Sequence, residues 1–232
     1  MTARPHDLLR LSGAAALGDT SLSGAARGNA PLSGTALGDT PLSGTALGDT
    51  PPGWVPASIA ACPWGVVRRA PHPPGLVPVG IRGPERWQRH AALVPRDAVT
   101  RSVPPEALRE RRPWLPLLAV TLSAVTLLLA GELEADAAWG PIGGVGFELA
   151  TGKPATHPGS DLDLLIRAPR RLDRALAARL TAVFGALPGR VDCQLETPSG
   201  GVGLVEWART GGPVMARTDH GPRLVDDPWI LV

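Results

Sequence analysis

The sequence predicts an α/β (α+β) fold in which a mixed sheet carries helices on one face and follows a smaller N-terminal region. Residues 160–166 and 190–196 alternate apolar and polar side chains, which indicates two strands because side chains two apart share a face. Residues 170–187 place apolar side chains at three- and four-residue steps, as in an amphipathic helix. Strand, helix and strand in this order are typical of a mixed α/β unit. The expected apolar stripe of the helix consists of Leu172, Leu176, Leu180, Val183 and Leu187.

Length, charge and cysteine content narrow the class of protein. The 232 residues suffice for one large domain or two small ones, and the formal net charge of +2 gives no argument for nucleic-acid binding. The two cysteines, Cys62 and Cys193, are far apart in sequence, which argues against a zinc site or a disulfide framework. The first residues lack the continuous apolar segment of a secretory signal. We therefore expect a cytoplasmic protein.

A ten-residue repeat of the type SGTALGDTPL fills residues 12–50. Its units hold too few large apolar side chains to offset the roughly 1–2 kcal/mol of backbone entropy lost per ordered residue. We therefore expect a disordered linker or insertion. The resulting division is an N-terminal segment (1–11), the repeat (12–53), an N-terminal α/β region (54–134) and a C-terminal domain (135–232).

The N-terminal region reads as short strands and helices. WGVVRRA and LVPVGIRG predict strands, ERWQRHAAL predicts a short helix, and PPEAL predicts the start of another helix. Residues 115–130 are strongly apolar but span only 16 residues, which is short of the ~20 that a membrane-spanning helix needs. We expect a buried core helix there and no membrane partner.

The C-terminal region begins with a strand that ends at Ile142, followed by a bend at Gly143-Gly144 and a short helix, VGFELAT. Residues 198–201 predict a turn, and Val202–Trp207 a hairpin partner for the strand before it.

Two aspartates in the segment SDLDLLI carry the sharpest chemical signal. Asp161 and Asp163 lie two residues apart in a predicted strand, so both carboxylates project from one face. Adjacent carboxylates repel each other, and a divalent cation removes that conflict. Oxygen ligands suit Mg²⁺, which keeps waters and substrate phosphates in its shell. The alternative is a strand end with two solvated acids.

The strand at 190–196 offers a third carboxylate. Asp192 and Glu196 lie on its polar face, and Cys193 lies on its core face as a small buried side chain. If this strand pairs with that of Asp161, Asp192 can reach the metal site and accept a proton from the acceptor hydroxyl. Whether Asp192 or Glu196 completes the site stays open.

Glycines and arginines supply candidate phosphate contacts. The Gly143-Gly144 bend exposes backbone N–H groups beside a helix N-terminus, where anions bind. Ser160 joins these glycines as an expected substrate contact. Guanidinium groups bind phosphate bidentately, and we expect Arg82 and Arg86 to do so. Solvated basic side chains are the alternative. Residues with an open role are Arg68, Arg69, Arg89, Glu148, Lys153 and His157.

A glycine bend, a DxD strand, a helix and a single-Asp strand resemble the DNA polymerase β-type nucleotidyltransferase superfamily. WGPIGGVGFELATGKP, SDLDLLIRAP, VDCQLETPSGG and GPRLVDDPW, together with PHDLLRL, PWGVVRRA and VPVGIRGPERWQRHAA, further resemble the malonate decarboxylase holo-acyl-carrier-protein synthase family. Members of that family are phosphoribosyl-dephospho-CoA transferases. The resemblance covers most of the chain except the repeat.

This resemblance implies a nucleotidyltransferase-like fold and a Mg²⁺-dependent transfer. Phosphoribosyl-dephospho-CoA would pass from its triphosphate precursor to a serine of the malonate decarboxylase acyl carrier subunit, releasing pyrophosphate. Asp161 and Asp163 would hold the metal, and Gly143 and Gly144 the triphosphate. Gly144 stands where a serine is common, so no hydroxyl is available there. Two alternatives stay open: an enzyme that adenylylates a small molecule or protein, and a non-catalytic binding protein of the same fold.

Overall fold

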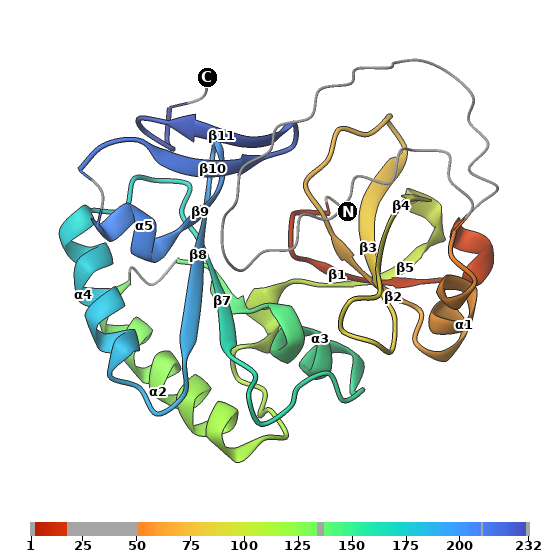
Figure 1. Ribbon diagram of the computed structural model, residues 1–232, viewed down its shortest axis with the longest axis horizontal. Helices are drawn as coiled ribbons and strands as arrows, with labels where there is room; N and C mark the ends of the chain where they lie inside the picture. The colour runs from red at the N-terminus through yellow and green to blue at the C-terminus, as the bar shows by residue number, and fades with distance from the viewer. Residues whose placement is uncertain (1–2, 18–50, 134–136, 210, 231–232) are drawn as a thin grey trace.

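The computed structural model describes residues 3–17, 51–133, 137–209 and 211–230, which form two sheets that face each other (Figure 1). One sheet has five strands in the order β4-β3-β2-β1-β5, and the other has six in the order β11-β10-β9-β8-β7-β6. The predicted α+β class is confirmed. Most of the repeat lies outside the described residues.

The first sheet is antiparallel throughout. Its strands are β1 (Leu8–Leu11), β2 (Trp64–Val67), β3 (Leu76–Arg82), β4 (Arg89–Pro95) and β5 (Val99–Val103). β1 lies between β2 and β5, so the segment that the sequence set apart as residues 1–11 supplies an interior strand. The predicted helix around residues 85–93 is wrong, because residues from Arg89 on form β4 along the edge of β3. Pairing with the preceding strand β3 outweighs the weak local helical pattern there.

The two faces of this sheet have different neighbours. One face buries Leu9 and Leu11 with Val55 and Ile59 of α1 (Trp54–Ala61). The other face turns Leu8 into the large core that it shares with the six-stranded sheet. The sheet is therefore a central layer between α1 and the second sheet.

The structure describes the first six residues of the repeat, 12–17. Residues Ala14–Leu17 form a 3-10 helix, η1, and both Ala16 and Leu17 are buried in the core beneath α1. The expectation of disorder from residue 12 onward is therefore wrong for this stretch. The physical reason is that Leu17, the last residue of η1, lies only six residues after β1 and meets an apolar cluster assembled by α1 and the sheet.

The six-stranded sheet is mixed. Its strands are β6 (Trp139–Pro141), β7 (Leu162–Arg167), β8 (Val191–Thr197), β9 (Gly200–Gly203), β10 (Val214–Thr218) and β11 (Gly221–Val225). Only β7 and β8 run parallel, and α4 (Arg174–Gly185) connects them. α2, α4 and α5 lie on one side of the sheet, and the five-stranded sheet lies on the other (Figure 1). α3 (Gly143–Thr151) lies towards the five-stranded sheet.

The apolar segment at 115–130 is a helix as predicted, α2 (Pro116–Glu132), but only one of its faces is buried, since Leu117, Val120 and Leu127 are exposed. It buries Leu118, Leu122 and Leu129 in the core that contains β7, β8 and α4. Helix α2 thus packs with the C-terminal sheet, although the sequence placed it in the region before residue 134. No helix in the described ranges has the length and hydropathy needed to cross a membrane.

Two further details differ from the prediction. α4 buries Ala177, Leu180 and Phe184, whereas Val183 is exposed, because the helix faces the sheet one position later than the leucine stripe implied. The predicted hairpin partner is only the four-residue strand β9, after which α5 (Leu204–Arg209) begins. Trp207 of α5 is fully buried, and its indole N–H donates to the carbonyl of Leu172.

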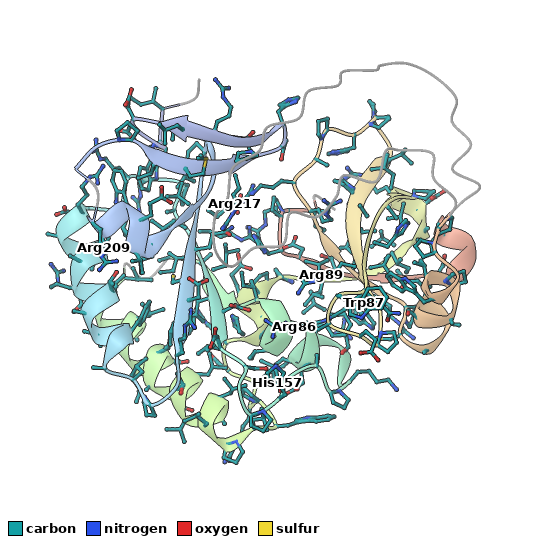
Figure 2. All side chains as sticks on the ribbon, viewed as in Figure 1. Arg86, Trp87, Arg89, His157, Arg209 and Arg217 are labelled. Carbon is teal, nitrogen blue, oxygen red and sulfur yellow. The ribbon has the colours of Figure 1, made fainter. Side chains whose placement is uncertain are left out.

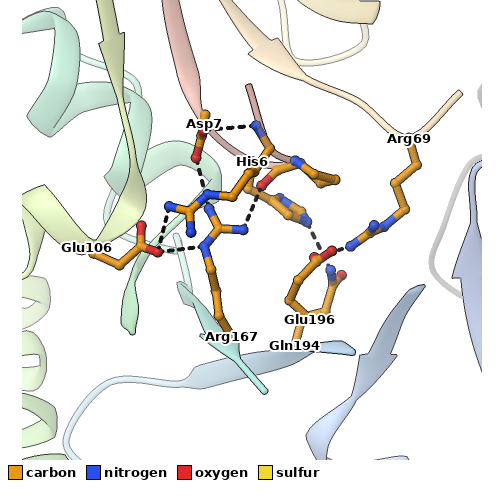
Figure 3. Close-up of polar contacts among 9 residues, drawn as sticks. His6, Asp7, Arg69, Glu106, Arg167, Gln194 and Glu196 are labelled. Carbon is orange, nitrogen blue, oxygen red and sulfur yellow. Dashed lines mark hydrogen bonds and ion pairs between the residues drawn. The ribbon is translucent and has the colours of Figure 1, made fainter. Parts of the chain in front are cut away.

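A buried polar cluster joins the two sheets (Figure 3). Arg167, the last residue of β7, donates to Asp7 just before β1 at 2.8 Å and also pairs with Glu106. Residue Glu106 belongs to η3 (Pro105–Leu108). Its hydrogen bonds, including the one from Arg167, keep its pKa below the ordinary value although burial acts in the opposite direction. These contacts fix β7 relative to the five-stranded sheet.

Replacing residues 18–50 with a short Gly/Ser linker should leave the melting temperature nearly unchanged, because the described core contacts of the repeat end at Leu17. Starting the replacement at residue 12 should lower it, since burial of Leu17 is lost. The single change Leu17→Ala should cost about 2 kcal/mol in the free energy of unfolding. Equal stability of the two replacements would show that η1 does not pack as described.

Candidate active site

The three aspartates lie at neighbouring strand ends of the six-stranded sheet. Asp161 directly precedes β7, and Asp163 is its second residue. Asp163 is the register partner of Asp192 in the parallel pair β7–β8, where neighbouring strands lie about 4.8 Å apart. The predicted pairing of the two Asp strands is thus confirmed, and three carboxylates lie together at the N-terminal ends of β7 and β8.

Gly143 leaves the space that the side chain of Asp163 occupies. Its φ of 61° lies in the left-handed region, and a Cβ there would overlap the carboxylate of Asp163. The neighbouring Ile142 N–H donates to the backbone carbonyl of Asp163 at 2.9 Å, which holds the start of α3 against β7. Only glycine satisfies both the backbone conformation and the close approach. The predicted glycine bend therefore borders the carboxylates directly.

Burial and the neighbouring carboxylates shift the pKa of Asp163 upward. Burial, followed by the charges of Asp192 and Asp161, raises its pKa from the ordinary 3.8 to about 6, while Arg89 and Arg82 act in the opposite direction. At neutral pH the carboxylate is therefore ionised at a cost. Such a group is a natural ligand for a cation.

The third carboxylate is Asp192 rather than Glu196. Glu196 lies four residues further along β8 and forms an ion pair with Arg69 of the five-stranded sheet. Asp192 is exposed beside Asp163. Within the part of the chain that the structure describes, no group of three or more His, Cys, Asp or Glu side chains is arranged to hold a metal.

Glu148 shapes the loop between α3 and β7. Its buried carboxylate accepts hydrogen bonds from the Trp114 N–H, the Ala155 N–H and the Thr156 hydroxyl, the last at 2.7 Å. The Ala155 carbonyl in turn lies against Gly144, at 3.2 Å from where a Cβ would stand. Sequence reasoning left Glu148 open, and the structure gives it a positioning role. An acidic residue within an apolar helical segment was the available signal.

A pocket of about 1320 Å³ extends from the aspartates across the five-stranded sheet. The predicted residues Gly143, Gly144, Ser160, Asp161 and Asp163 line one end. From the opposite sheet come Arg82, Arg86 and Arg89, as Figure 2 shows for the last two between the halves of the molecule. Carboxylates from one sheet and guanidinium groups from the other thus share one pocket.

The arginines stand close to one another. Arg82 and Arg89 are register partners in β3–β4, a like-charged arrangement that is unfavourable without a counter-charge. Arg82 lies 6.0 Å from the ring centre of Phe147 in α3, and burial followed by the charges of Arg89 and Arg86 lowers its pKa. Together these groups gather positive charge in the pocket that Asp163 also lines.

Other candidates have different surroundings. Arg69 is paired with Glu196, and the thiol of Cys193 is buried with its pKa raised by that burial, as expected for a core side chain. His157 is exposed on the loop before β7 and accepts a hydrogen bond from the Gly159 N–H. Ser160 accepts from the His157 N–H at 2.9 Å, so its hydroxyl oxygen stabilises this loop.

Two family models divide the chain at the junction of the sheets. The phosphoribosyl-dephospho-CoA transferase MdcG N-terminal domain matches residues 4–105, and the C-terminal domain of the same family matches residues 107–228. The chain belongs to this family. The family expected from the sequence motifs is thereby confirmed, and the boundary between the two models falls near residue 106 rather than residue 134.

Curated relatives agree with this membership. The chain is 47% identical to the phosphoribosyl-dephospho-CoA transferase of Pseudomonas putida, over 78% of this chain and 87% of the relative. Enzymes of the same name from Azotobacter vinelandii and Klebsiella pneumoniae are 45% and 41% identical, over 77% and 76% of this chain and 85% and 86% of theirs. No solved structure gives a significant match.

Gly143→Ala should destabilise the fold more than Gly152→Ala. Both glycines have left-handed φ values, 61° and 68°, so each alanine costs about 1–2 kcal/mol of backbone strain. Only at Gly143 does the added Cβ also meet Asp163, whereas nothing lies within 4 Å at Gly152. Chemical denaturation measures the difference. In an Asp163→Ala background the difference should shrink, because only Cβ of residue 163, at 3.0 Å, remains near the added methyl; an undiminished difference would contradict the described overlap.

Asp163→Asn should stabilise the metal-free protein at pH 7.5. Because the folded-state pKa is about 6 and the ordinary value 3.8, the folded chain binds more protons between these values. Stability therefore falls as pH rises from about 4 to about 6, and the amide abolishes this loss. The measurement is the melting temperature against pH in EDTA. Asp97→Asn, at an exposed carboxylate, is the control; identical pH profiles for both variants would refute the assignment.

Proposed function

We propose that this protein attaches phosphoribosyl-dephospho-CoA, taken from its triphosphate precursor, to a serine of the malonate decarboxylase acyl carrier subunit. The observation that carries the proposal is the meeting of Asp161, Asp163 and Asp192 with the start of α3, opposite the arginines of the other sheet. The names of the relatives and of both family domains support the transferred group. The modest net charge gives no reason to propose nucleic acid as a partner.

We further propose Mg²⁺ as the cofactor, held by Asp161 and Asp163. The donor set fits, because Mg²⁺ is commonly bound by one or two carboxylates while waters and substrate phosphates complete its shell. The raised pKa of Asp163 and the space that Gly143 leaves beside its carboxylate support a cation at this point. The ion would supply positive charge that offsets the repulsion between the carboxylates and the incoming triphosphate.

In the proposed transfer step, Asp192 and the arginines of the pocket have separate roles. The serine hydroxyl of the carrier attacks the α-phosphorus, a new P–O bond forms, and the bond between the α- and β-phosphates breaks. The proton of the hydroxyl goes to Asp192, which is exposed beside Asp163 and so accessible to an incoming carrier. Arg82, Arg86 and Arg89 stabilise the negative charge of the departing pyrophosphate. The N–H groups at the start of α3 point towards the phosphates.

We place this reaction in the cytoplasm. The two cysteines, Cys62 and Cys193, are both free, and a reducing compartment keeps thiols in that state.

Incubation with the triphosphate precursor, Mg²⁺ and the apo carrier subunit should raise the carrier mass by one phosphoribosyl-dephospho-CoA unit and release one pyrophosphate. Mass spectrometry and a pyrophosphate assay measure both products. Asp161→Asn and Asp163→Asn should reduce the rate by at least a hundredfold, and EDTA should stop the reaction until Mg²⁺ is restored.

ATP in place of the precursor serves as the substrate control and should give little adenylylation. Efficient use of ATP with no use of the precursor would favour the alternative of an adenylylating enzyme. Full activity in EDTA would refute the metal.

A further inference from the structure

Arg68 lies in the same pocket but away from the carboxylates. It follows the last residue of β2, and its backbone N–H donates to the carbonyl of Pro78 at 2.9 Å. Its side-chain stem crosses Gly80, where a Cβ would stand 3.2 Å from Cδ of Arg68. Since Pro78, Gly80 and Arg82 alternate along β3, Arg68 extends over the same face that carries Arg82.

The guanidinium of Arg68 has no ion pair or hydrogen bond with any other described residue, although the side chain is half-buried. Its neighbour Arg69 points to the other side of the strand end and pairs with Glu196. Burial lowers the pKa of Arg68, and no nearby carboxylate counteracts this. A half-buried cation that faces a pocket without a partner is costly unless an anion from a ligand joins it.

The floor between Arg68 and Arg82 is lined by small residues. Gly80 pairs in register with Ala91 of β4, and both line the pocket. Arg68 starts beside Pro78, and its stem reaches over Gly80, two residues or about 7 Å from Arg82 along the strand. The face therefore offers a second cationic position next to the group of Arg82, Arg86 and Arg89.

We infer that Arg68 binds the diphosphate of the dephospho-CoA part of the substrate, while the arginines beside Asp163 bind the triphosphate. This inference rests on the proposed function. The precursor carries two anionic groups, the triphosphate on one ribose and the diphosphate between adenosine and the pantetheine arm, and sugar rings separate them. The small side chain of Ala91, beside Gly80 in the pocket lining, leaves room for those sugars. Arg68 thereby distinguishes the CoA precursor from a simple nucleoside triphosphate, which lacks the second anionic group.

Binding of three probes tests this assignment: dephospho-CoA, inorganic triphosphate and adenosine, each titrated calorimetrically in the presence of Mg²⁺. Arg68→Gln should weaken dephospho-CoA about tenfold or more, the loss expected for a charged hydrogen bond, and leave triphosphate and adenosine unchanged. Arg82→Gln should weaken triphosphate and leave dephospho-CoA nearly unchanged. Arg101→Gln, an exposed arginine of β5 outside the pocket, is the control and should change none of the three.

Several outcomes would overturn the inference. Unchanged dephospho-CoA affinity in Arg68→Gln, equal weakening of all probes, or no measurable binding of dephospho-CoA by the unmodified protein would each do so. The carrier assay separates this failure from failure of the proposed function. If the wild-type enzyme transfers the group to the carrier in that assay, only the role of Arg68 is wrong. If the wild-type enzyme does not transfer it, the proposed reaction itself is wrong.

Discussion

The buried ion cluster around Arg167 is the contact on which the site depends. Arg167 ends β7, the strand at whose start Asp161 and Asp163 lie, and it is fixed by Asp7 and Glu106 from the side of the five-stranded sheet. Removal of one partner from such a buried cluster typically costs about 3–5 kcal/mol, because a charge is left unpaired. A further contact between the two halves is the ion pair of Arg69 and Glu196 (Figure 3). Both restrain the sheets as a unit.

The geometry of the pocket follows from this restraint. The carboxylates belong to the six-stranded sheet and the arginines to the five-stranded sheet, so neither half contains a complete site. Because the clusters lie several residues beyond Asp163 and Asp192 along β7 and β8, the strand ends near the pocket stay free of cross-sheet ion pairs. The conflict of like charges on each side, carboxylate on one and guanidinium on the other, is the arrangement that a metal–triphosphate ligand would relieve.

Much of the site could be predicted from local patterns, since alternation within a strand decides which side chains share a face. Asp161 and Asp163 were placed in this way, and so was Asp192 opposite the core face of Cys193. The helix at 85–93 and the strand at 202–207 were predicted wrongly, because short segments take the structure that their partners impose. The structural work of Glu148 and Arg167 was also missed, because their partners lie on other elements, in part far along the chain.

By itself, the sequence determined the α+β class, the family, the edge that carries the carboxylates and the core helix α2. The tertiary structure alone decided which arginines face Asp163, that Asp192 rather than Glu196 stands beside it, and that Gly143 must lack a Cβ. It also gave two neighbouring arginines different surroundings. Arg69 forms an ion pair with Glu196, whereas Arg68 is half-buried in the pocket without an ion pair among the described residues. The physical reason is that side-chain periodicity is a local property, whereas register, ion pairing and burial are set by contacts between segments far apart in the chain.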